Sequence, residues 1–498
     1  MIEMKYYEFI NEISKDELIE GLIGYGFFAE KIPPMFTSIP LYEFCRRTGY
    51  SWTIKKDHSA ITYESIRNIS VPRLLSIPHP AGYVNQCKYI HDVWDDLKTY
   101  FYEKTKDQTF KISRIHIRKL KDRKELFEMN YKNGEKDGYP ETDISIGARY
   151  LVKADISNCF PSIYTHAVSW ALVGLEVAKR NQNDHTKWYN ILDFYTRALK
   201  ENETHGILIG PHSSNVISEI ILCAIDYLLF DKYKFTRDID DYACYVKSHQ
   251  EAEEFLINLS STLKNFGLSL NHKKTEIIKL PYASEASWKT TLNSIQLPEK
   301  ISIPFLKHYL DSAIEFVNKT GNVAIIYYAI KVLSEKEFYV NAKAYYFKTI
   351  HHLIIIYPYL LPIIDEYVLL PLSIVKEDIK NLSNNILHDG VKFKRYDAIS
   401  FAIYFALKYD FELSETNFLE MSKKREDCIF MVLAFLYDKK NNPILMRDYK
   451  SLALALQLDI MEMDKYWLFL YEVLSKEELL DTQYKTLKNG RVSFIKSL

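Results

Sequence analysis

The chain has 498 residues, of which 47% are hydrophobic and 26% charged, and its formal net charge is −1. This length suits about three domains of roughly 150 residues, and the composition excludes a disordered chain. Because the net charge is near zero, no overall basic field attracts nucleic acid, and any basic surface has to be local. The six cysteines show no CxxC or zinc spacing, which is typical of a reducing cytoplasm, the location we expect.

The first third predicts short elements. Residues 1–70 read as short helices and turns, without the apolar core of a signal peptide. Residues 72–83 contain three prolines and predict an irregular loop. An amphipathic helix is expected over 88–104, then a two-faced strand over 110–120, where isoleucines alternate with basic residues. The basic stretch 111–136 has two interpretations, a solvated face or a grip on phosphates.

The central third alternates strands and helices around three acids. Residues 149–156 predict a strand that carries Asp155, and 235–248 predict a strand, a tight turn with Asp240 and Asp241, and a second strand. The order of elements fits an antiparallel sheet with helices on its far face. Converging carboxylates need cations to stay ionised. Two divalent metals about 3.5–4 Å apart would satisfy them and run phosphoryl or nucleotidyl transfer.

Beyond about residue 300, glycine is nearly absent and the strand patterns end. We expect helices over 302–318, 322–338, 342–369, 373–387, 395–410, 416–439, 443–457 and 462–479. About 40 residues per helix pair is close to the period of HEAT or armadillo arrays. The most apolar stretch, 353–364, is too short to span a bilayer, so we expect a soluble protein with no membrane partner.

The turn after Asp155 reads Ile156, Ser157, Asn158, Cys159, Phe160. Its main-chain amides could meet a triphosphate. Phe160, five residues after the acid, has two interpretations. Its ring could lie under the sugar, where it leaves no room for a 2′-hydroxyl, or it could be a core aromatic.

Four segments in order resemble reverse transcriptases. KADISNCFPSIYTHAVSWAL resembles motif A in the form found in bacterial abortive-infection (Abi, AbiK-like) and defence-associated enzymes. HGILIGPHSSNVISEI is similar to their motif B, with Ile209 in place of the glutamine of templated enzymes. RDIDDY resembles motif C, and FGLSLNHKKTEI resembles motif D. The resemblance covers residues 70–290.

The resemblance implies an α+β fold: reverse transcriptase fingers and palm, an antiparallel sheet with helices, followed by an all-α HEAT-like helical array. The implied domains are an N-terminal helical extension (1–70), fingers and palm (71–300) and a C-terminal helical repeat domain (301–498).

The resemblance also implies a role for individual residues. Asp155, Asp240, Asp241 and the Ile156 carbonyl would bind two Mg²⁺ ions, with Mn²⁺ as an alternative. The turn residues Ser157 to Phe160 would contact the nucleotide, with Phe160 favouring dNTPs over NTPs.

Further roles are implied for the surrounding segments. Gly210 would sit beside the nascent pair. Lys273 or Lys274 would act as general acid, or as counter-charge, for pyrophosphate. Basic residues of the fingers would bind the triphosphate, with these candidates: Arg118, Lys119, Arg123 and Arg149.

The implied activity is an anti-phage DNA polymerase using dNTPs, template-independent and primed by a tyrosine to which the DNA product stays attached. A noncoding RNA template is one alternative, and a catalytically weakened palm acting as a binding scaffold is another. Relatives form closed homo-oligomers, so we expect one here. Two departures bear on these readings: Ile209, and Asp238 at a position that is usually aromatic. Asp238 could raise a neighbour's pKa, pair with Arg237 or another arginine, or alter the primer grip.

Overall fold

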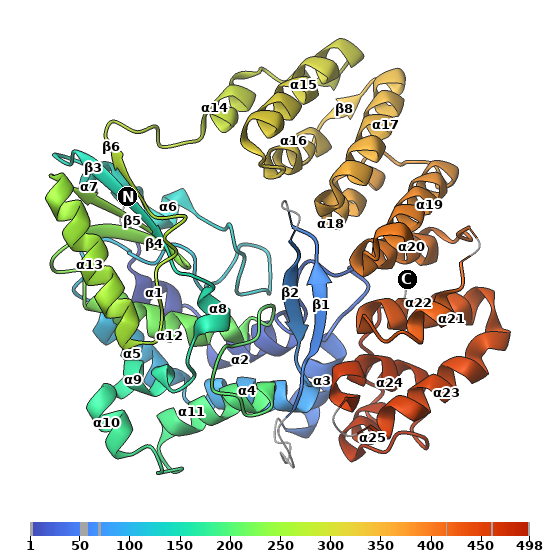
Figure 1. The fold of residues 1–498 in the computed structure, drawn as a ribbon, viewed down its shortest axis with the longest axis horizontal. Coiled ribbons are helices and arrows are strands. Elements are labelled where there is room, and N and C mark those ends of the chain that lie inside the picture. Colours follow the sequence, from blue (N-terminus) through green and yellow to red (C-terminus); the bar gives the residue numbers. More distant parts are fainter. Residues whose placement is uncertain (1–2, 50–57, 68–70, 415, 460–461, 497–498) are drawn as a thin grey trace.

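The computed structural model describes residues 3–49, 58–67, 71–414, 416–459 and 462–496. A sheet-containing first half and a helical second half curve around a central β-hairpin (Figure 1). The first half begins with short helices: α1 (Tyr6–Asn11), α2 (Lys15–Ile19), the π-helix η1 (Glu20–Tyr25) and α3 (Ile39–Thr48). The short helices predicted for this region are therefore present.

The central hairpin pairs β1 (Ile61–Ser65) with β2 (Arg73–Ile77) in antiparallel register. The irregular loop predicted over 72–83 is wrong over most of its length. Pro80 occupies the first position of α4 (Pro80–Asp92), where its missing amide hydrogen costs no helical hydrogen bond. Prolines here mark the beginnings of regular elements rather than a loop.

The palm-like sheet is antiparallel with strand order β4–β5–β3–β6, as the order of elements predicts. Helix α13 packs against β3 and β5, and its Phe255 and Leu259 are fully buried. Burial alternates along β5, so one face of the strand enters the core. The strands are β3 (Tyr150–Asp155), β4 (Lys234–Asp238), β5 (Asp241–Val246) and β6 (Glu276–Lys279).

Helices cover one side of this sheet and connect it to the hairpin. The helix predicted over 88–104 is two helices, α4 and α5, interrupted at Val93. Helix α12 begins at Ser213. The remaining helices of the first half are α5 (Trp94–Thr105), α6 (Gly134–Asp137), α7 (Pro140–Ile144), α8 (Cys159–Ser162), α9 (Ala167–Val173), α10 (Leu175–Arg180), α11 (Trp188–Arg197), the 3₁₀ turn η2 (Ala198–Lys200), α12 (Ser213–Tyr227) and α13 (His249–Asn265).

The segment 110–120 forms no strand, contrary to the prediction. It makes one isolated parallel bridge, Ser113 with Arg237, and residues 111–118 are all buried. Lys111 and Arg118 both pair with Asp137 inside the core. The alternation of basic and apolar residues therefore reflects two buried faces. The basic side chains at its start are neither a solvated face nor a grip on phosphates.

The second half is helical, and its ribbon runs from the palm-like sheet around to the N-terminal helices (Figure 1). Successive helices pack on one another, for example α19 on α20 and α20 on α22. The HEAT-like assignment itself stays a prediction. The helices are α14 (Ser287–Ser294), α15 (Ile303–Thr320), α16 (Ala324–Ser334), α17 (Val340–Ile356), η3 (Pro358–Leu360), α18 (Leu361–Ile364), η4 (Asp365–Leu369), α19 (Lys376–Phe393), α20 (Tyr396–Tyr409), α21 (Phe418–Ser422), α22 (Cys428–Asn441), η5 (Pro443–Leu445), α23 (Met446–Gln457), η6 (Met463–Tyr466), α24 (Trp467–Val473) and α25 (Thr482–Asn489).

The helical boundaries differ from the predicted ones at two breaks. The helix expected over 342–369 ends at Ile356, because Pro358 cannot continue it, and the chain turns by 118°. The helix expected over 416–439 divides at Asp427, whose side chain caps α22. A short parallel pair joins α14–α15 to α16–α17: β7 (Lys300–Ile301) and β8 (Glu337–Phe338).

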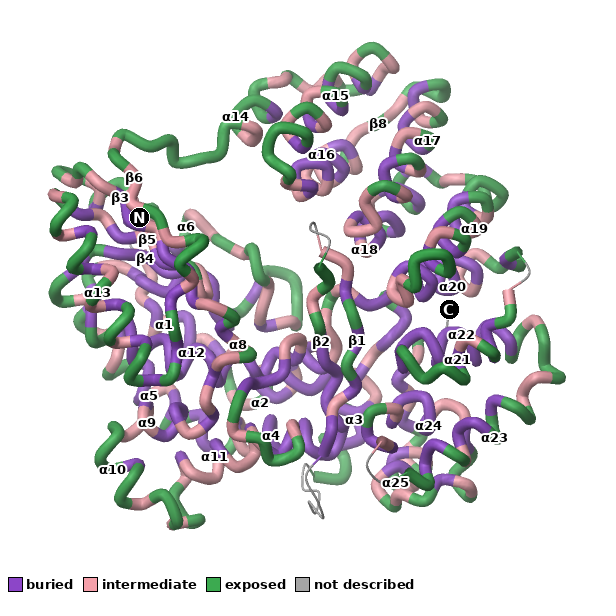
Figure 2. Tube along the Cα trace, in the orientation of Figure 1, coloured by how far each residue is buried: buried purple, intermediate pink, exposed green. Residues whose placement is uncertain are grey.

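The segment before α3 pairs with the C-terminal segment. Phe36 forms a bridge with Ile495, and the Thr37 amide donates to the Phe494 carbonyl oxygen at 2.9 Å. The base of the hairpin and α4 lie in buried chain at this junction, whereas α10 is largely exposed (Figure 2). The pairing of β1 with β2 crosses the domain limit predicted at residue 70. The three domain limits stay predictions.

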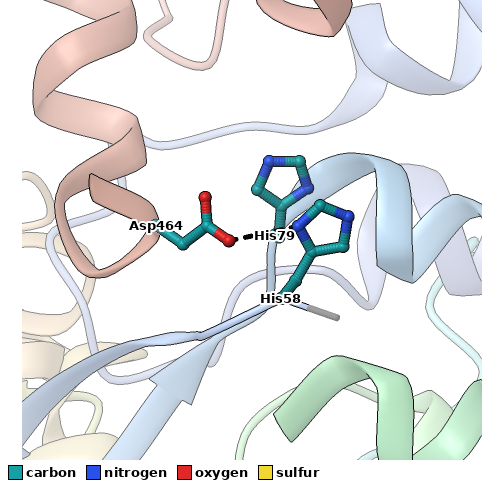
Figure 3. Close-up of side chains that lie close together, drawn as sticks. All are labelled: His58, His79 and Asp464. Carbon is teal, nitrogen blue, oxygen red and sulfur yellow. Dashed lines mark hydrogen bonds and ion pairs between the residues drawn. The ribbon is translucent and has the colours of Figure 1, made fainter. Parts of the chain in front are cut away.

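A buried polar contact reinforces this junction. His58 and His79 stack with ring centroids 3.8 Å apart and planes 4° apart, and Nδ1 of His58 lies 3.1 Å from Oδ2 of Asp464 (Figure 3). Among the described residues, they are the one group of three possible metal ligands whose ligand atoms lie within 4.8 Å of one another. Imidazole lone pairs lie in the ring planes, so two parallel rings cannot converge on one ion at about 2.0–2.1 Å. We interpret the group as packing between the two halves.

Within the described residues, no single helix has the length and apolarity needed to cross a membrane. One bent pair, Val340–Ile356 with Pro358–Leu369, reaches both only when its two parts are taken together.

Candidate active site

Three aspartates from neighbouring strands lie together at one edge of the sheet. Asp155 ends β3, Asp241 begins β5, and Asp240 lies in the turn before it. In the antiparallel register Asp155 pairs with Asp241, and the Ile156 amide donates to the Asp240 carbonyl oxygen at 3.1 Å. Asp155 is 5% exposed, whereas Asp241 faces solvent. The structure therefore places the three aspartates that the sequence singled out at one edge of the sheet.

The turn that presents Asp240 has an uncommon backbone conformation. Ile239 has a φ of +60°, a left-handed value that costs a β-branched residue about 1–3 kcal/mol. Its carbonyl oxygen accepts a hydrogen bond from Nη1 of Arg237 at 2.8 Å. Arg237 is fully buried, and Nη2 lies 2.7 Å from Asp226 and 3.1 Å from Glu219. A buried ionic network therefore holds the turn from behind.

Among the described residues, Asp155 is the one acid at this edge with an ion pair, which it forms with Lys274. Partial burial and then the charges of Asp240 and Asp155 raise the pKa of Asp241 to about 7, and burial followed by the Asp155 charge raises the pKa of Asp240. Nζ of Lys274 lies 2.7 Å from Oδ2 of Asp155, and this hydrogen bond raises the pKa of Lys274. Asn271 donates to Oδ1 of Asp155 at 2.9 Å. Neither Asp240 nor Asp241 has an ion pair with any residue that the structure describes.

The donors at this edge suit hard divalent cations. Mg²⁺ and Mn²⁺ prefer carboxylate and carbonyl oxygens, and the three aspartates provide the carboxylates. The Ile156 carbonyl oxygen accepts no hydrogen bond from the described part of the chain, so the fourth expected ligand is available. The raised carboxylate pKa values express a shortage of positive charge that bound cations would relieve. The residues present therefore fit a divalent metal centre.

The turn after Asp155 offers backbone amides rather than side chains. The amides of Asn158, Cys159 and Phe160 donate to no other residue in the described ranges, and Asn158 has a φ of +45° at the start of α8. The Ser157 amide differs, because it donates to the Ser269 carbonyl oxygen at 2.8 Å. Cys159 is 3% exposed and burial raises the pKa of its thiol, so only its backbone can face a ligand. Phe160 is half-buried against the core, and both interpretations of its ring stay open.

The glycine turn before α12 packs against the central hairpin. Gly210 has a φ of +134°, and a Cβ atom there would lie 2.8 Å from the Ser76 carbonyl oxygen, so this approach requires glycine. The Ser76 amide donates to the Ile209 carbonyl oxygen at 2.8 Å, and the Ile207 amide donates to that of Phe160 at 3.0 Å. The turn thus ties β2 to the segment that follows Asp155.

Three cations outside the predicted site lie near one another around the central hairpin, and Arg73 acts electrostatically on Asp240. Arg73 begins β2, Arg67 follows β1, and Lys31 follows η1. Burial and then mutual repulsion lower the pKa values of Lys31 and Arg73, while the Asp240 charge acts on Arg73 in the opposite direction. None of the three has an ion pair with a described residue. Its place at the start of a strand is the signal that would identify Arg73, but the prolines of residues 72–83 predict a loop there.

Three predicted nucleotide-binding residues lie elsewhere. Arg118 is 1% exposed and its Nη1 lies 2.7 Å from Oδ1 of Asp137, so its charge is used in the core and the prediction is wrong. Arg149 precedes β3 at the end opposite to Asp155, about 20 Å away at 3.3 Å per residue. Lys273 is exposed without a side-chain contact to the aspartates; Lys274 is the lysine that reaches them.

The remaining finger candidates and Asp238 have surface partners. Lys119 pairs with Glu17, and Arg123 pairs with Glu128. Asp238 lies opposite Asp241 in the hairpin register, and its Oδ2 is 2.7 Å from Nζ of Lys132. Its partner is thus a lysine rather than an arginine. Asp238 is not among the groups that shift the pKa of Asp240 or Asp241.

Comparison with known proteins gives one family match. Residues 95–306 match the family model described as reverse transcriptase (RNA-dependent DNA polymerase), a range that contains all three aspartates and Lys274. A search of curated proteins gave no match.

Solved structures with weak similarity include telomerases. The telomerase from Candida tropicalis in complex with a TWJ fragment of telomeric RNA is 11% identical, with a TM-score of 0.34, covering 73% of this chain and 66% of that one. The truncated apo telomerase from Candida tropicalis is 12% identical, with a TM-score of 0.32, covering 49% and 55%. The telomerase from Candida albicans in complex with a TWJ fragment is 12% identical, with a TM-score of 0.30, covering 70% and 64%. The chain thus spans between about half and two thirds of these proteins.

Proposed function

We propose that this chain is a DNA polymerase of the reverse transcriptase type, which adds dNTPs by nucleotidyl transfer at Asp155, Asp240 and Asp241. The observation that carries the proposal is the charge pattern of the edge. Asp240 and Asp241 have no ion pair with a described residue, and Arg73 of the hairpin, which also has none, acts electrostatically on Asp240. The reverse transcriptase match over residues 95–306 contains this edge and supports polymerase chemistry.

Bound Mg²⁺, held by the three aspartates and the Ile156 carbonyl, would activate the attacking hydroxyl and neutralise the leaving pyrophosphate. The chain's own residues provide position and charge. Arg73 and Lys31 form a cationic pair suited to the triphosphate, and the open amides of the turn after Asp155 can donate to its oxygens. Lys274 holds a proton at Nζ that it can give to pyrophosphate, or it acts as counter-charge only.

The direct test is synthesis from labelled dNTPs and Mg²⁺ by the purified chain. We expect polymer from the wild type and none from Asp240→Asn. The matched control is Asp238→Asn, which removes an acid from the same hairpin that pairs with Lys132 on the surface. Continued synthesis by Asp240→Asn would contradict the assignment of a metal centre to these aspartates.

Phe160 is proposed as the steric gate that excludes the 2′-hydroxyl of NTPs. We expect the wild type to prefer dNTPs and Phe160→Ala to incorporate NTPs as well. If the wild type already prefers NTPs, the ring is a core aromatic and has no gating role.

The finer proposal is template-independent synthesis primed by a tyrosine, in anti-phage defence and in a homo-oligomer. It is supported by the resemblance of the four motifs to Abi enzymes and by Ile209 in the place of glutamine. Mass spectrometry of protein purified from cells tests it: a nucleotide adduct on a tyrosine is expected. An unmodified polypeptide with a co-purifying RNA of one length would favour a noncoding-RNA template instead.

A binding scaffold with a weakened palm is the second candidate, favoured by Asp238 and Ile209. The labelled-dNTP assay separates it from the polymerase, since a scaffold gives no polymer under any metal condition.

A further inference from the structure

A pocket of about 790 Å³ lies between the central hairpin and the helical half. Its volume is within the range of ligand pockets, about 300–1,000 Å³. Figure 1 shows the hairpin standing between the palm-like sheet on one side and helices α18 to α20 on the other. Strands β1 and β2 form one wall, and the ends of α15, α17 and α19 with the beginning of α20 form the other.

Unpaired cations line this pocket. Arg67 comes from the hairpin, and Lys394 and Arg395 come from the connection between α19 and α20. None of the three forms an ion pair with a residue in the described ranges. The Arg395 guanidinium lies over the ring of Phe393, 5.1 Å from its centroid. These side chains can bind anionic groups without first giving up a carboxylate partner.

The pocket also contains acids, most of them already engaged by the protein. Asp397 accepts a hydrogen bond from the Ile66 amide at 2.7 Å, and Asp427 accepts one from the Phe430 amide at 2.7 Å. Burial raises the pKa of Asp397 to about 7, so this carboxyl is about half protonated at neutral pH, whereas Asp427, whose pKa is raised to about 6, stays mostly ionised there. The other two lining acids are Glu426, which hydrogen-bonds Tyr396, and Glu64 on β1.

Apolar and aromatic side chains are exposed around the same pocket. Phe393 is 53% exposed, Leu74 is 56% exposed and Ile356 is 50% exposed. Tyr357 and Tyr359 lie half-buried in the wall. Aromatic rings interleaved with cations are the arrangement that binds single-stranded nucleic acid, because bases stack on rings while cations meet phosphates.

The pocket adjoins the catalytic edge through the hairpin. Arg73 lies next to the lining residues Pro72 and Leu74, and its pKa responds both to Asp240 and to Tyr359 in the pocket wall. Arg73 therefore links the catalytic edge to the pocket wall.

We propose that this pocket binds single-stranded DNA, the strand that leaves the catalytic edge, with phosphates at Arg67, Lys394 and Arg395 and bases on Phe393. The inference rests on the proposed polymerase function, which supplies the strand. Its occupant is DNA rather than RNA because the adjoining site is proposed to use dNTPs.

The test measures binding without synthesis. A labelled oligodeoxythymidine is titrated by fluorescence anisotropy into the full chain carrying Asp240→Asn, with no dNTPs present. In that background, Arg67→Gln, Lys394→Gln and Arg395→Gln together should weaken binding and lower the slope of log K against log salt by about 0.7 for each phosphate that the variant no longer neutralises. Phe393→Ala should weaken binding about tenfold, and Phe393→Tyr, which keeps a ring at an exposed position, should bind like the parent.

The matched control removes two cations elsewhere. Lys179→Gln with Arg180→Gln on exposed α10 should leave affinity and salt slope close to the parent values. Unchanged binding by the triple variant and by Phe393→Ala, or an equal loss in the α10 control, would contradict the proposal that the pocket binds DNA. Tighter binding of an oligouridine of equal length would overturn DNA as its occupant.

The assay separates this inference from the proposed function. If the wild type makes no polymer but the pocket variants lose DNA binding as expected, the pocket binds single-stranded DNA, and the polymerase proposal fails together with the proposed origin of the strand. If polymer is made and pocket variants bind DNA like the α10 control, the polymerase stands and the pocket inference fails.

Discussion

The two sides of the β4–β5 turn hold acids under opposite conditions. Behind the turn, Glu219 and Asp226 are buried and share the guanidinium of Arg237. In front of it, Asp240 and Asp241 have no ion pair with a described residue. Buried acids are tolerated where a fork of donors satisfies them, and unsatisfied acids at a sheet edge indicate a ligand that brings positive charge. The contrast separates acids that build the turn from acids available for chemistry.

The largest effect is expected from breaking the buried side. Arg237→Met leaves Glu219 and Asp226 buried without a cation and removes the donor to the Ile239 carbonyl oxygen. We expect a loss of about 3–5 kcal/mol in the free energy of unfolding, measured by chemical denaturation. Neutralising both acids together with Arg237 should recover part of that loss.

The control for this prediction is the surface pair that Asp238 of the same hairpin forms with Lys132. Lys132→Met breaks the pair with Asp238, whose members are 47% and 37% exposed, and should cost less than about 1 kcal/mol. Equal losses from the buried and surface variants would show that the network behind the turn has no special role.

The next effect sharpens the catalytic side. Lys274 is 63% exposed in its pair with Asp155, so Lys274→Met should change stability little. If Lys274 is a general acid, nucleotide incorporation should fall by about a hundredfold and the alkaline limb of the pH–rate profile should disappear. Lys274→Arg keeps the charge, and full rescue by that variant would reduce the role of Lys274 to counter-charge.

A smaller effect concerns pH. The pKa of Asp241 is raised to about 7 in the folded chain, whereas it is about 4 in the unfolded chain. Between about pH 4 and pH 7, the folded chain therefore holds a proton on Asp241 that the unfolded chain has lost. The contribution of Asp241 to stability therefore falls as pH rises from about 4 to about 7. Asp241→Asn should raise Tm by about 1–2 °C at pH 8 and have no effect near pH 4.

Metal should replace the proton at high pH. Adding Mg²⁺ at pH 8 should raise the Tm of the wild type and leave that of Asp241→Asn almost unchanged. Asp143→Asn, at an exposed position on α7, is the matched control and should behave like the wild type. A metal response equal in all three proteins would place the cation elsewhere.

The sequence predicted the parts of this site that depend on local pattern. The strand before Asp155 and the two strands around Asp240 are short, alternating and rich in aromatic or β-branched residues, and each forms as expected. The lysine at the edge was reduced to two candidates, Lys273 and Lys274, because neighbours in sequence share a turn. Spacing could not decide between them, since only the fold shows which side chain reaches Asp155.

The parts that failed depend on contacts between distant segments. Arg118 was assigned to a nucleotide because its partner, Asp137, lies beyond a turn-rich stretch with no signal of return. Arg73 was missed because three nearby prolines indicate a loop unless one knows that β1 pairs with β2. In both cases a charge was visible in the sequence but its partner, or its lack of one, was not.

The smallest effect tests whether strain in the turn serves the catalytic side. Ile239→Gly permits a φ of +60° without steric cost but adds freedom to the unfolded chain, so stability should change by less than about 1 kcal/mol. If the network behind the turn positions Asp240 through a rigid backbone, incorporation should fall a few-fold, because glycine loosens the link between Arg237 and Asp240. Ile239→Val keeps the β-branch and should match the wild type in both measurements. Full activity in the glycine variant would mean that the strand register, rather than the strained residue, sets the position of the carboxylate.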